Sequence, residues 1–314
     1  MSYNTAIAIQ NNSVIQGSTF NSNLLQHYLS YLDIAPKSVE TYNRALTQLF
    51  RYLQRNCIEN PTRKDIVAWR EELKEAHKPS TVQNYITATK IFFAWCEQEH
   101  IYSNITDHLK GAKISREHKK DYLTAQQVRE VIANIDRSTV KGVRDYAIFL
   151  LMVNGGLRDI EVQRANIEDL TTKSGETVLY LQGKDRDERA DFVIIDSTVE
   201  HAIRQYLKTR KNTTGKDPLF VSCSNHNTDG RLTTRAISGI IKSALVSAGF
   251  DSDRLTAHSL RHTAVTLALM QGATLQEAQQ FARHSNLATT EIYAHNLDRI
   301  NNRCGAWIMG AIYG

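Results

Sequence analysis

The apolar residues of this chain follow a helical spacing in two long stretches, and this spacing is the strongest constraint on its fold. The first stretch covers residues 20–105 and has the size of a four- or five-helix bundle. The second extends from residue 122 to 300 and is interrupted near 177–195 by two β-rich runs around a charged tip, a hairpin pattern. We therefore expect a mainly α (α+β) protein, with an N-terminal helical bundle followed by a mostly helical domain that contains a small antiparallel β-sheet.

Helix starts in the first stretch are predicted from capping residues. Pro36 ends the first helix, and Ser38 is a suitable N-cap for the second. Ser80 is the predicted N-cap of the fourth helix.

A basic segment without apolar periodicity separates the two stretches. Residues 110–120 contain five Lys or Arg residues against one acid, which is typical of an interdomain linker. The residues before the first helix are polar and indicate a flexible arm. The predicted parts are the arm 1–18, the helical bundle 19–108, the basic linker 109–121, the second domain 122–300 and a C-terminal tail 301–314.

Composition excludes several protein classes. The 314 residues carry a net charge of +5, which permits a polyanionic partner without requiring one. The longest apolar run, 146–153, is too short to span a bilayer, and the N-terminus has no secretory signal, so we expect no membrane partner. The four cysteines form no CxxC pair, which argues against a zinc site or a disulfide framework and favours a reducing cytoplasm.

Five segments hold residues suited to phosphate chemistry, although each alone is typical of an ordinary surface or core position. Arg158 follows a Gly pair at a helix start, where a guanidinium can face an anion beside helix N–H groups. Lys184 lies on the hairpin tip and could reach a site as a proton donor. His258 and Arg261 are three residues apart on a helix and project to the same side. The last two segments contain His284 and Tyr293.

A zinc hydrolase is an alternative, because His258 and His262 are four residues apart. A helical metalloprotease motif needs Glu directly after the first His, and this chain has Ser259 there. The sequence therefore argues against a metal site.

Taken together, these residues resemble the catalytic signature of the tyrosine recombinase (phage integrase) family, in the order Arg158, Lys184, His258, Arg261, His284 and Tyr293. The steps of 3, 23 and 9 between the last four are similar to the family's spacing, and the resemblance covers about nine-tenths of the chain. It implies a core-binding domain over 20–105 and a catalytic domain over about 120–300. It also implies DNA breakage and rejoining through a 3′-phosphotyrosine and a Holliday junction, without ATP, metal or other cofactor.

The residues then have expected roles in attack on a phosphodiester. A site without a metal needs fixed cations for the transition state, and Arg158 and Arg261 can bind the two non-bridging oxygens. Tyr293 is the expected nucleophile, and His258 is the expected acceptor of its proton.

Three further residues complete the expected site. Lys184 is the candidate acid for the leaving 5′ oxygen, and His284 is expected to hydrogen-bond a non-bridging oxygen. Glu161, one turn after Arg158, is expected to orient that arginine or its neighbours.

Three positions depart from the family pattern. Gly155 stands where the family often has Thr, and Asp185 stands where the hairpin often has a second Gly. Arg283 stands where Gly commonly precedes the second His. None of the three removes a catalytic group.

Two polar faces of the bundle, the linker and two further arginines are the predicted DNA contacts, although charged faces of helices are often only solvated. These residues are Arg44, Gln48, Arg51 and Arg55; Gln83, Thr87 and Lys90; Lys113, Arg116, Lys119 and Lys120; and Arg189 and Arg283. The expected partner is double-stranded DNA with an inverted-repeat core site, and its binding should weaken steeply with salt.

The resemblance further implies a homotetramer on two duplexes, in which each C-terminal segment docks on a neighbouring protomer. An apolar group on this tail is the candidate docking element, with packing onto its own domain as the alternative. Its members are Ala306, Trp307, Ile308, Met309 and Ile312.

Several biological tasks are compatible with this chemistry. The arm before residue 20 is too short for a separate arm-site domain, which favours a simple recombinase that recognises one core site. The polar character of the arm favours a mobile element, and we expect the protein to act in the cytoplasm at the nucleoid. Xer-type resolution of chromosome or plasmid dimers is one alternative. A type IB topoisomerase or telomere resolvase and a non-catalytic accessory DNA-binding protein are the others.

Overall fold

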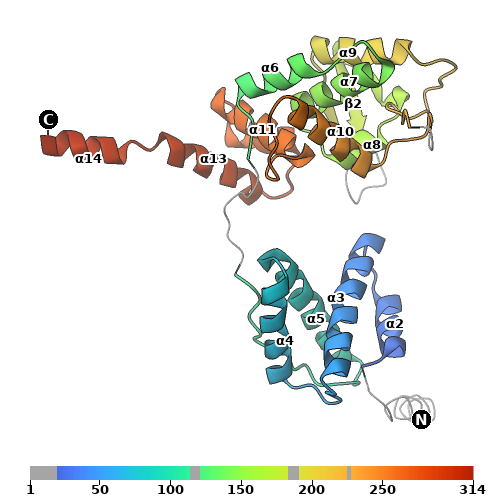
Figure 1. Ribbon diagram of the computed structural model, residues 1–314, viewed down its shortest axis with the longest axis vertical. Helices are drawn as coiled ribbons and strands as arrows, with labels where there is room; N and C mark the ends of the chain where they lie inside the picture. The colour runs from blue at the N-terminus through green and yellow to red at the C-terminus, as the bar shows by residue number, and fades with distance from the viewer. Residues whose placement is uncertain (1–19, 114–120, 183–190, 225–227, 314) are drawn as a thin grey trace. The chain divides into compact units, whose positions relative to one another are not determined.

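The computed structural model describes residues 20–113, 121–182, 191–224 and 228–313. The chain divides into two compact units, Met1–Arg116 and Glu117–Gly314 (Figure 1). Each unit has its own hydrophobic core, as two domains of this size require. Within the described ranges, no helix combines the length and the apolar content needed to cross a membrane.

The described part of the first unit is a helical bundle built around α5. Its helices are α2 (Ser22–Tyr31), α3 (Pro36–Arg55), α4 (Arg63–Ala76) and α5 (Pro79–Gln98). α5 packs against both α3 and α4. Phe92 of α5 makes edge-to-face contacts with Tyr28 and Phe50, with ring centroids 5.2 and 5.6 Å apart, an arrangement that the ring quadrupoles favour. The apolar stripes of the sequence therefore form this core.

The predicted helix starts at Ser38 and Ser80 are wrong. α3 begins at Pro36 and α5 begins at Pro79. Proline suits the first position of a helix, because its fixed φ is already helical. The N–H that proline lacks would have no intrahelical acceptor at this position. Both serines consequently lie within the first turn of their helices rather than before it.

The first residues of the predicted linker pack on the first unit. Leu109 is 2% exposed and belongs to the core of the bundle. The carbonyl of Lys110 accepts a hydrogen bond of 2.6 Å from Nη1 of Arg70. Arg116, Lys119 and Lys120 lie outside the described residues.

The described part of the second unit is mostly helical. Its helices are α6 (Ala125–Asn134), α7 (Val140–Gly155), α8 (Asp159–Arg164), the 3-10 helix η1 (Ile167–Asp169), α9 (Ser197–Lys208), α10 (Thr234–Ser247), α11 (Ala257–Met270), α12 (Leu275–Ala282), α13 (Ala288–Asn301) and α14 (Cys304–Tyr313). α7 contacts α9 and α11 and buries Ile148, Phe149 and Leu151 completely. The expected mainly α (α+β) class is confirmed.

The single sheet of the described residues is antiparallel and has the order β1-β2-β3. Its strands are β1 (Leu170–Lys173), β2 (Glu176–Leu181) and β3 (Asp191–Ile194). The predicted hairpin is the β2–β3 pair, in which Leu179 lies opposite Val193. β1 was not expected, because it has a single apolar residue among four and is mostly exposed. The tip with Lys184 and Arg189 lies outside the described residues.

Candidate active site

A turn formed by Gly155 and Gly156 at the end of α7, which we call the glycine turn, positions Arg158. α7 ends at Gly155, and Gly156 adopts a left-handed conformation with φ 55° and ψ 37°, which favours glycine. A Cβ at Gly156 would lie 3.0 Å from Cε1 of Phe281, so glycine also lets α12 approach the turn closely. Arg158 follows as the N-cap of α8, with 33% of its side chain exposed.

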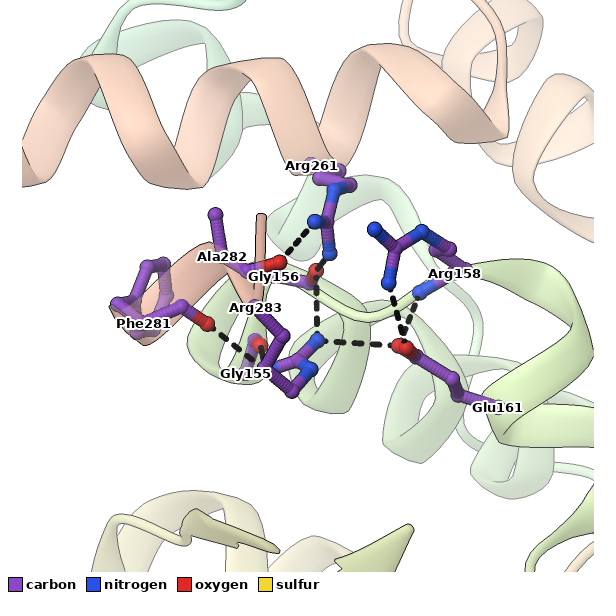
Figure 2. A network of polar contacts seen from close by, with 8 residues as sticks. All are labelled: Gly155, Gly156, Arg158, Glu161, Arg261, Phe281, Ala282 and Arg283. Carbon is purple, nitrogen blue, oxygen red and sulfur yellow. Dashed lines mark hydrogen bonds and ion pairs between the residues drawn. The ribbon is translucent and has the colours of Figure 1, made fainter. Parts of the chain in front are cut away.

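Glu161 of α8 is buried and holds two guanidinium groups (Figure 2). Its Oε1 accepts a hydrogen bond of 2.8 Å from Nη1 of Arg158. Its Oε2 accepts one of 2.8 Å from the backbone N–H of Arg158 and one of 3.0 Å from Nη2 of Arg283. Burial acts to raise the pKa of this carboxyl, but Arg283, the Arg158 N–H and the charges of Arg158 and Arg261 together lower it. Glu161 is therefore an ionised anchor for both arginines.

Arg261 of α11 lies close to Glu161, Arg158 and Arg283. Its side chain is almost fully buried, and it donates from Nη1 to the carbonyl of Gly156 at 2.6 Å and from Nη2 to the carbonyl of Ala282 (Figure 2). These two bonds tie α11 to the glycine turn and to the end of α12. Burial, with the neighbouring charges of Arg158 and Arg283, lowers the pKa of Arg261 to about 9.

Arg158, Arg261 and Arg283 form what we call the arginine cluster. Three guanidinium groups against the one carboxylate of Glu161 leave two positive charges at this point of the structure. A buried excess of like charge is costly unless an anion balances it. The cluster is thus suited to an anionic ligand such as a phosphodiester.

Tyr293 of α13 lies beside the cluster and is 5% exposed. Its ring centroid is 5.1 Å from that of His262 and 6.1 Å from that of His284. Burial raises the pKa of its phenol to about 12, although the charges of Arg261 and Arg158 act in the opposite direction. The hydroxyl therefore keeps its proton at neutral pH and needs an acceptor before it can act as a nucleophile.

His284 follows Arg283, the C-cap of α12, where the chain turns toward α13. Its Nδ1 is 2.9 Å from Oγ1 of Thr290, which orients the ring. Burial and the charges of Arg261, Arg158 and Arg283, with His258, lower the pKa of His284 to about 4. His284 is consequently neutral at pH 7 and can donate one hydrogen bond without adding to the local charge.

Sequence reasoning missed His262 as a neighbour of the nucleophile candidate. His262 is buried, and its ring contacts both His258, at 4.7 Å, and Tyr293. The signal was its spacing of four residues from His258, which places both on one face of α11. In the described part of the chain, no group of three or more His, Cys, Asp and Glu side chains is arranged to hold a metal ion.

The side chain of Arg283 lies in the interior of the site. Its side chain is 9% exposed, and its guanidinium donates to Glu161 and to the carbonyls of Gly155, Gly156 and Phe281. These internal acceptors engage both terminal nitrogens of the guanidinium, while its Nε is buried without a hydrogen-bond partner. Arg283 therefore belongs to the interior of the site, and its contact with DNA stays a prediction.

The predicted contact residues of the bundle differ in their surroundings. Arg51 is exposed, Arg44 pairs with Glu40 at 3.0 Å, and Arg55 pairs with Glu72 at 2.6 Å. The half-buried set consists of Gln48, Gln83, Thr87 and Lys90, and Gln83 donates to Oγ1 of Thr87 at 3.3 Å. Lys113, the described residue of the linker set, is exposed.

Comparisons with known proteins match both units. Residues 121–299 match the Phage integrase family, and residues 24–100 match the N-terminal SAM-like domain of phage integrases. Among curated relatives, tyrosine recombinase XerC of Caldanaerobacter subterraneus is 26% identical over 302 residues, covering 87% of this chain and 82% of XerC.

Solved structures show the same fold. The XerH site-specific recombinase bound to its difH substrate has a TM-score of 0.71 at 20% identity, covering 84% of this chain and 78% of XerH. Residues 82–397 of the Tn1549 transposon integrase, in complex with transposon right end DNA, have a TM-score of 0.68 at 17% identity, covering 88% of this chain and 94% of that fragment. With more than half of its length matched by the family's catalytic region, this chain belongs to the phage integrase family and is a tyrosine site-specific recombinase.

Proposed function

We propose that this recombinase cuts DNA by attack of the Tyr293 hydroxyl on a phosphodiester held by the arginine cluster. The phenol oxygen bonds to phosphorus, the bond from phosphorus to the 5′ oxygen breaks, and the 5′-OH leaves with a proton. The 3′-phosphotyrosine that remains is itself an ester of phosphate. Attack by another 5′-OH therefore reverses the step and rejoins DNA without ATP or metal ion.

The observation that carries this proposal is the position of a buried tyrosine beside two unbalanced positive charges. The phosphodiester brings one negative charge, and its pentacoordinate transition state carries two, which match the excess of the cluster. Fixed cations that fit the transition state better than the ground state lower the barrier. Arg158 and Arg261 bind the non-bridging oxygens in this scheme, and neutral His284 donates a hydrogen bond to one of them.

Proton transfer completes the step. His258 accepts the phenol proton in this scheme. Its ring centroid is 4.7 Å from that of His262, whose centroid is 5.1 Å from that of Tyr293. The family resemblance supports Lys184, between β2 and β3 in the sequence, as the group that protonates the leaving 5′ oxygen.

The first unit and the C-terminal helix serve DNA binding and assembly in this proposal. The first unit acts as the core-binding domain on double-stranded DNA, supported by its match to the SAM-like domain and by the DNA complexes of XerH and the Tn1549 integrase.

A homotetramer on two duplexes at the nucleoid follows from the same resemblance. α14 exposes 51–80% of each of its large apolar side chains, which supports docking on a second copy of the chain. These side chains are Trp307, Ile308, Met309, Ile312 and Tyr313.

Arg51→Ala is expected to weaken DNA binding and to lower the slope of log affinity against log salt by about 0.9, the value for one phosphate contact. Arg51 is exposed on α3, so its loss leaves the bundle core intact. Fluorescence anisotropy across a salt series measures both quantities. The matched control is Arg204→Ala, which removes an exposed arginine from α9. An unchanged slope would show that Arg51 is only solvated.

The test of the proposed function is to trap the covalent intermediate and locate it. A nicked suicide duplex, carrying the site that the protein selects from random-sequence DNA, is incubated with the protein in EDTA. We expect an adduct that survives denaturation, with the nucleotide on the tryptic peptide 284–299, in which Tyr293 is the single tyrosine. Stable DNA binding without any adduct would instead support the accessory DNA-binding protein.

For the biological task, we propose recombination of a mobile element, with Xer-type dimer resolution as the second candidate. The Xer proteins among the relatives favour the second. Chromatin immunoprecipitation separates the two. Occupancy at the ends of a mobile element supports the first, and occupancy at a single chromosomal site supports dimer resolution.

A further inference from the structure

Arg283 occupies a backbone position that normally favours glycine. It caps the C-terminus of α12 with φ 54° and ψ 44°, in the left-handed region. An L-residue with a long side chain is strained there, so the conformation needs compensation from other contacts. The guanidinium of Arg283 is the source of such contacts.

This guanidinium joins the end of α12 to the region of the glycine turn and α8, which lies 122 to 128 residues earlier in the chain. Nη1 donates to the carbonyls of Phe281, at 2.8 Å, and Gly155, at 3.2 Å. Nη2 donates to the carbonyl of Gly156, at 3.2 Å, and to Oε2 of Glu161, at 3.0 Å. Figure 2 shows the side chain pointing from the end of α12 toward the glycine turn and the start of α8.

The backbone and the side chain of Arg283 each connect it to a residue with a proposed role in cleavage, His284 and Arg158 respectively. Its backbone directly precedes His284, whose own N–H bonds back to the carbonyl of Gln279 at 3.1 Å. Its side chain shares the carboxylate of Glu161 with Arg158. The ion pair therefore couples the position of Arg158 to the turn that presents His284.

We propose that Arg283 is a positioning residue for DNA cleavage, which holds the Glu161–Arg158 pair and the His284 turn in one fixed arrangement. This inference rests on the proposed function. Its side chain acts through Glu161 and through the carbonyls of the glycine turn, not by touching DNA. A fork with donors in fixed directions can bind several acceptors at once, which explains why an arginine is placed here.

The proposal predicts a separation of binding from catalysis. Arg283→Gly relieves the left-handed strain but leaves Glu161 with one guanidinium partner in place of two. We expect DNA affinity within roughly a factor of two of wild type, because the residue is buried. The cleavage rate at saturating suicide duplex should fall about 100-fold, the size of effect that small misplacements of reacting groups cause.

The pH profile supplies a readout that a merely structural role would not move. Arg283, Arg158 and Arg261 are the charged groups facing Glu161, and Arg283 is the strongest of the influences that lower its pKa. Arg283→Gly should therefore raise the pKa of Glu161 and move the acidic limb of the cleavage profile to higher pH. Arg283→Lys keeps the positive charge but loses the planar fork. The acidic limb of its pH profile should therefore stay near that of wild type, while its cleavage rate should lie between those of wild type and Arg283→Gly.

The matched control is Ser174→Gly, which relieves a left-handed residue at φ 51° in the exposed β1–β2 turn. It should cleave at the wild-type rate. Thermal unfolding identifies any variant that fails to fold, and Arg283→Lys then decides the question by its rate and its acidic limb.

Three outcomes would overturn the inference. A tenfold weaker affinity with a smaller salt slope and an unchanged rate would make Arg283 a DNA contact. A wild-type rate in a folded Arg283→Gly would make it a stability brace alone. Absence of adduct from wild type and Ser174→Gly as well would remove the proposed function, and this inference with it.

Discussion

Tyr293→Phe is expected to abolish the covalent adduct and to lower the rate of strand cleavage by at least about 1,000-fold, as loss of a nucleophile does in other covalent enzymes. The substitution removes the hydroxyl and keeps the ring. Since the ring of Tyr293 packs against His262 and His284, the fold of the site and the affinity for DNA should change little. Cleavage is measured under single-turnover conditions on the nicked suicide duplex, and affinity by anisotropy on the same DNA.

The matched control is Tyr180→Phe, which removes a phenol hydroxyl from a half-buried tyrosine of β2. It should form the adduct at the wild-type rate. Adduct formation by Tyr293→Phe at more than a few per cent of wild type would show that another residue is the nucleophile.

Arg261→Lys is expected to lower the cleavage rate by roughly 100- to 1,000-fold, the range found when one preorganised donor to a transition-state charge is lost. Lysine keeps the positive charge but cannot present two nitrogens in a rigid fork. It therefore cannot hold the carbonyls of Gly156 and Ala282 and face a phosphate at the same time. The rate at saturating duplex measures this effect.

The same substitution should also destabilise the second unit. Arg261 is almost fully buried, and the two carbonyls that it serves would lose a donor, at a cost of about 1–3 kcal/mol. Thermal unfolding with and without DNA measures the loss. Arg204→Lys, on the exposed face of α9, is the control and should match wild type in both assays. A wild-type cleavage rate in folded Arg261→Lys would contradict the proposed role of the guanidinium fork.

Local pattern was sufficient for most of the architecture. The helices of the bundle, α7 and the β2–β3 hairpin follow from apolar spacing, because period 3.6 or 2 reflects which side chains face a core. The starts of α3 and α5 were predicted at the wrong residues, because two start signals compete in each segment. The serine matches the N-cap preference, whereas the nearby proline matches the first position of the helix, and the structure follows the proline. β1 lacks an apolar pattern and forms because β2 offers an edge.

The sequence by itself also determined which residue types could perform the chemistry, since their order and spacing identify the family. Tertiary structure alone decided how they are coupled. Arg283 binds the carboxylate of Glu161, which lies 122 residues earlier in the chain. His262 looked like a candidate metal ligand and lies against Tyr293. Such contacts depend on how α8, α11, α12 and α13 pack, and no local spacing encodes that packing.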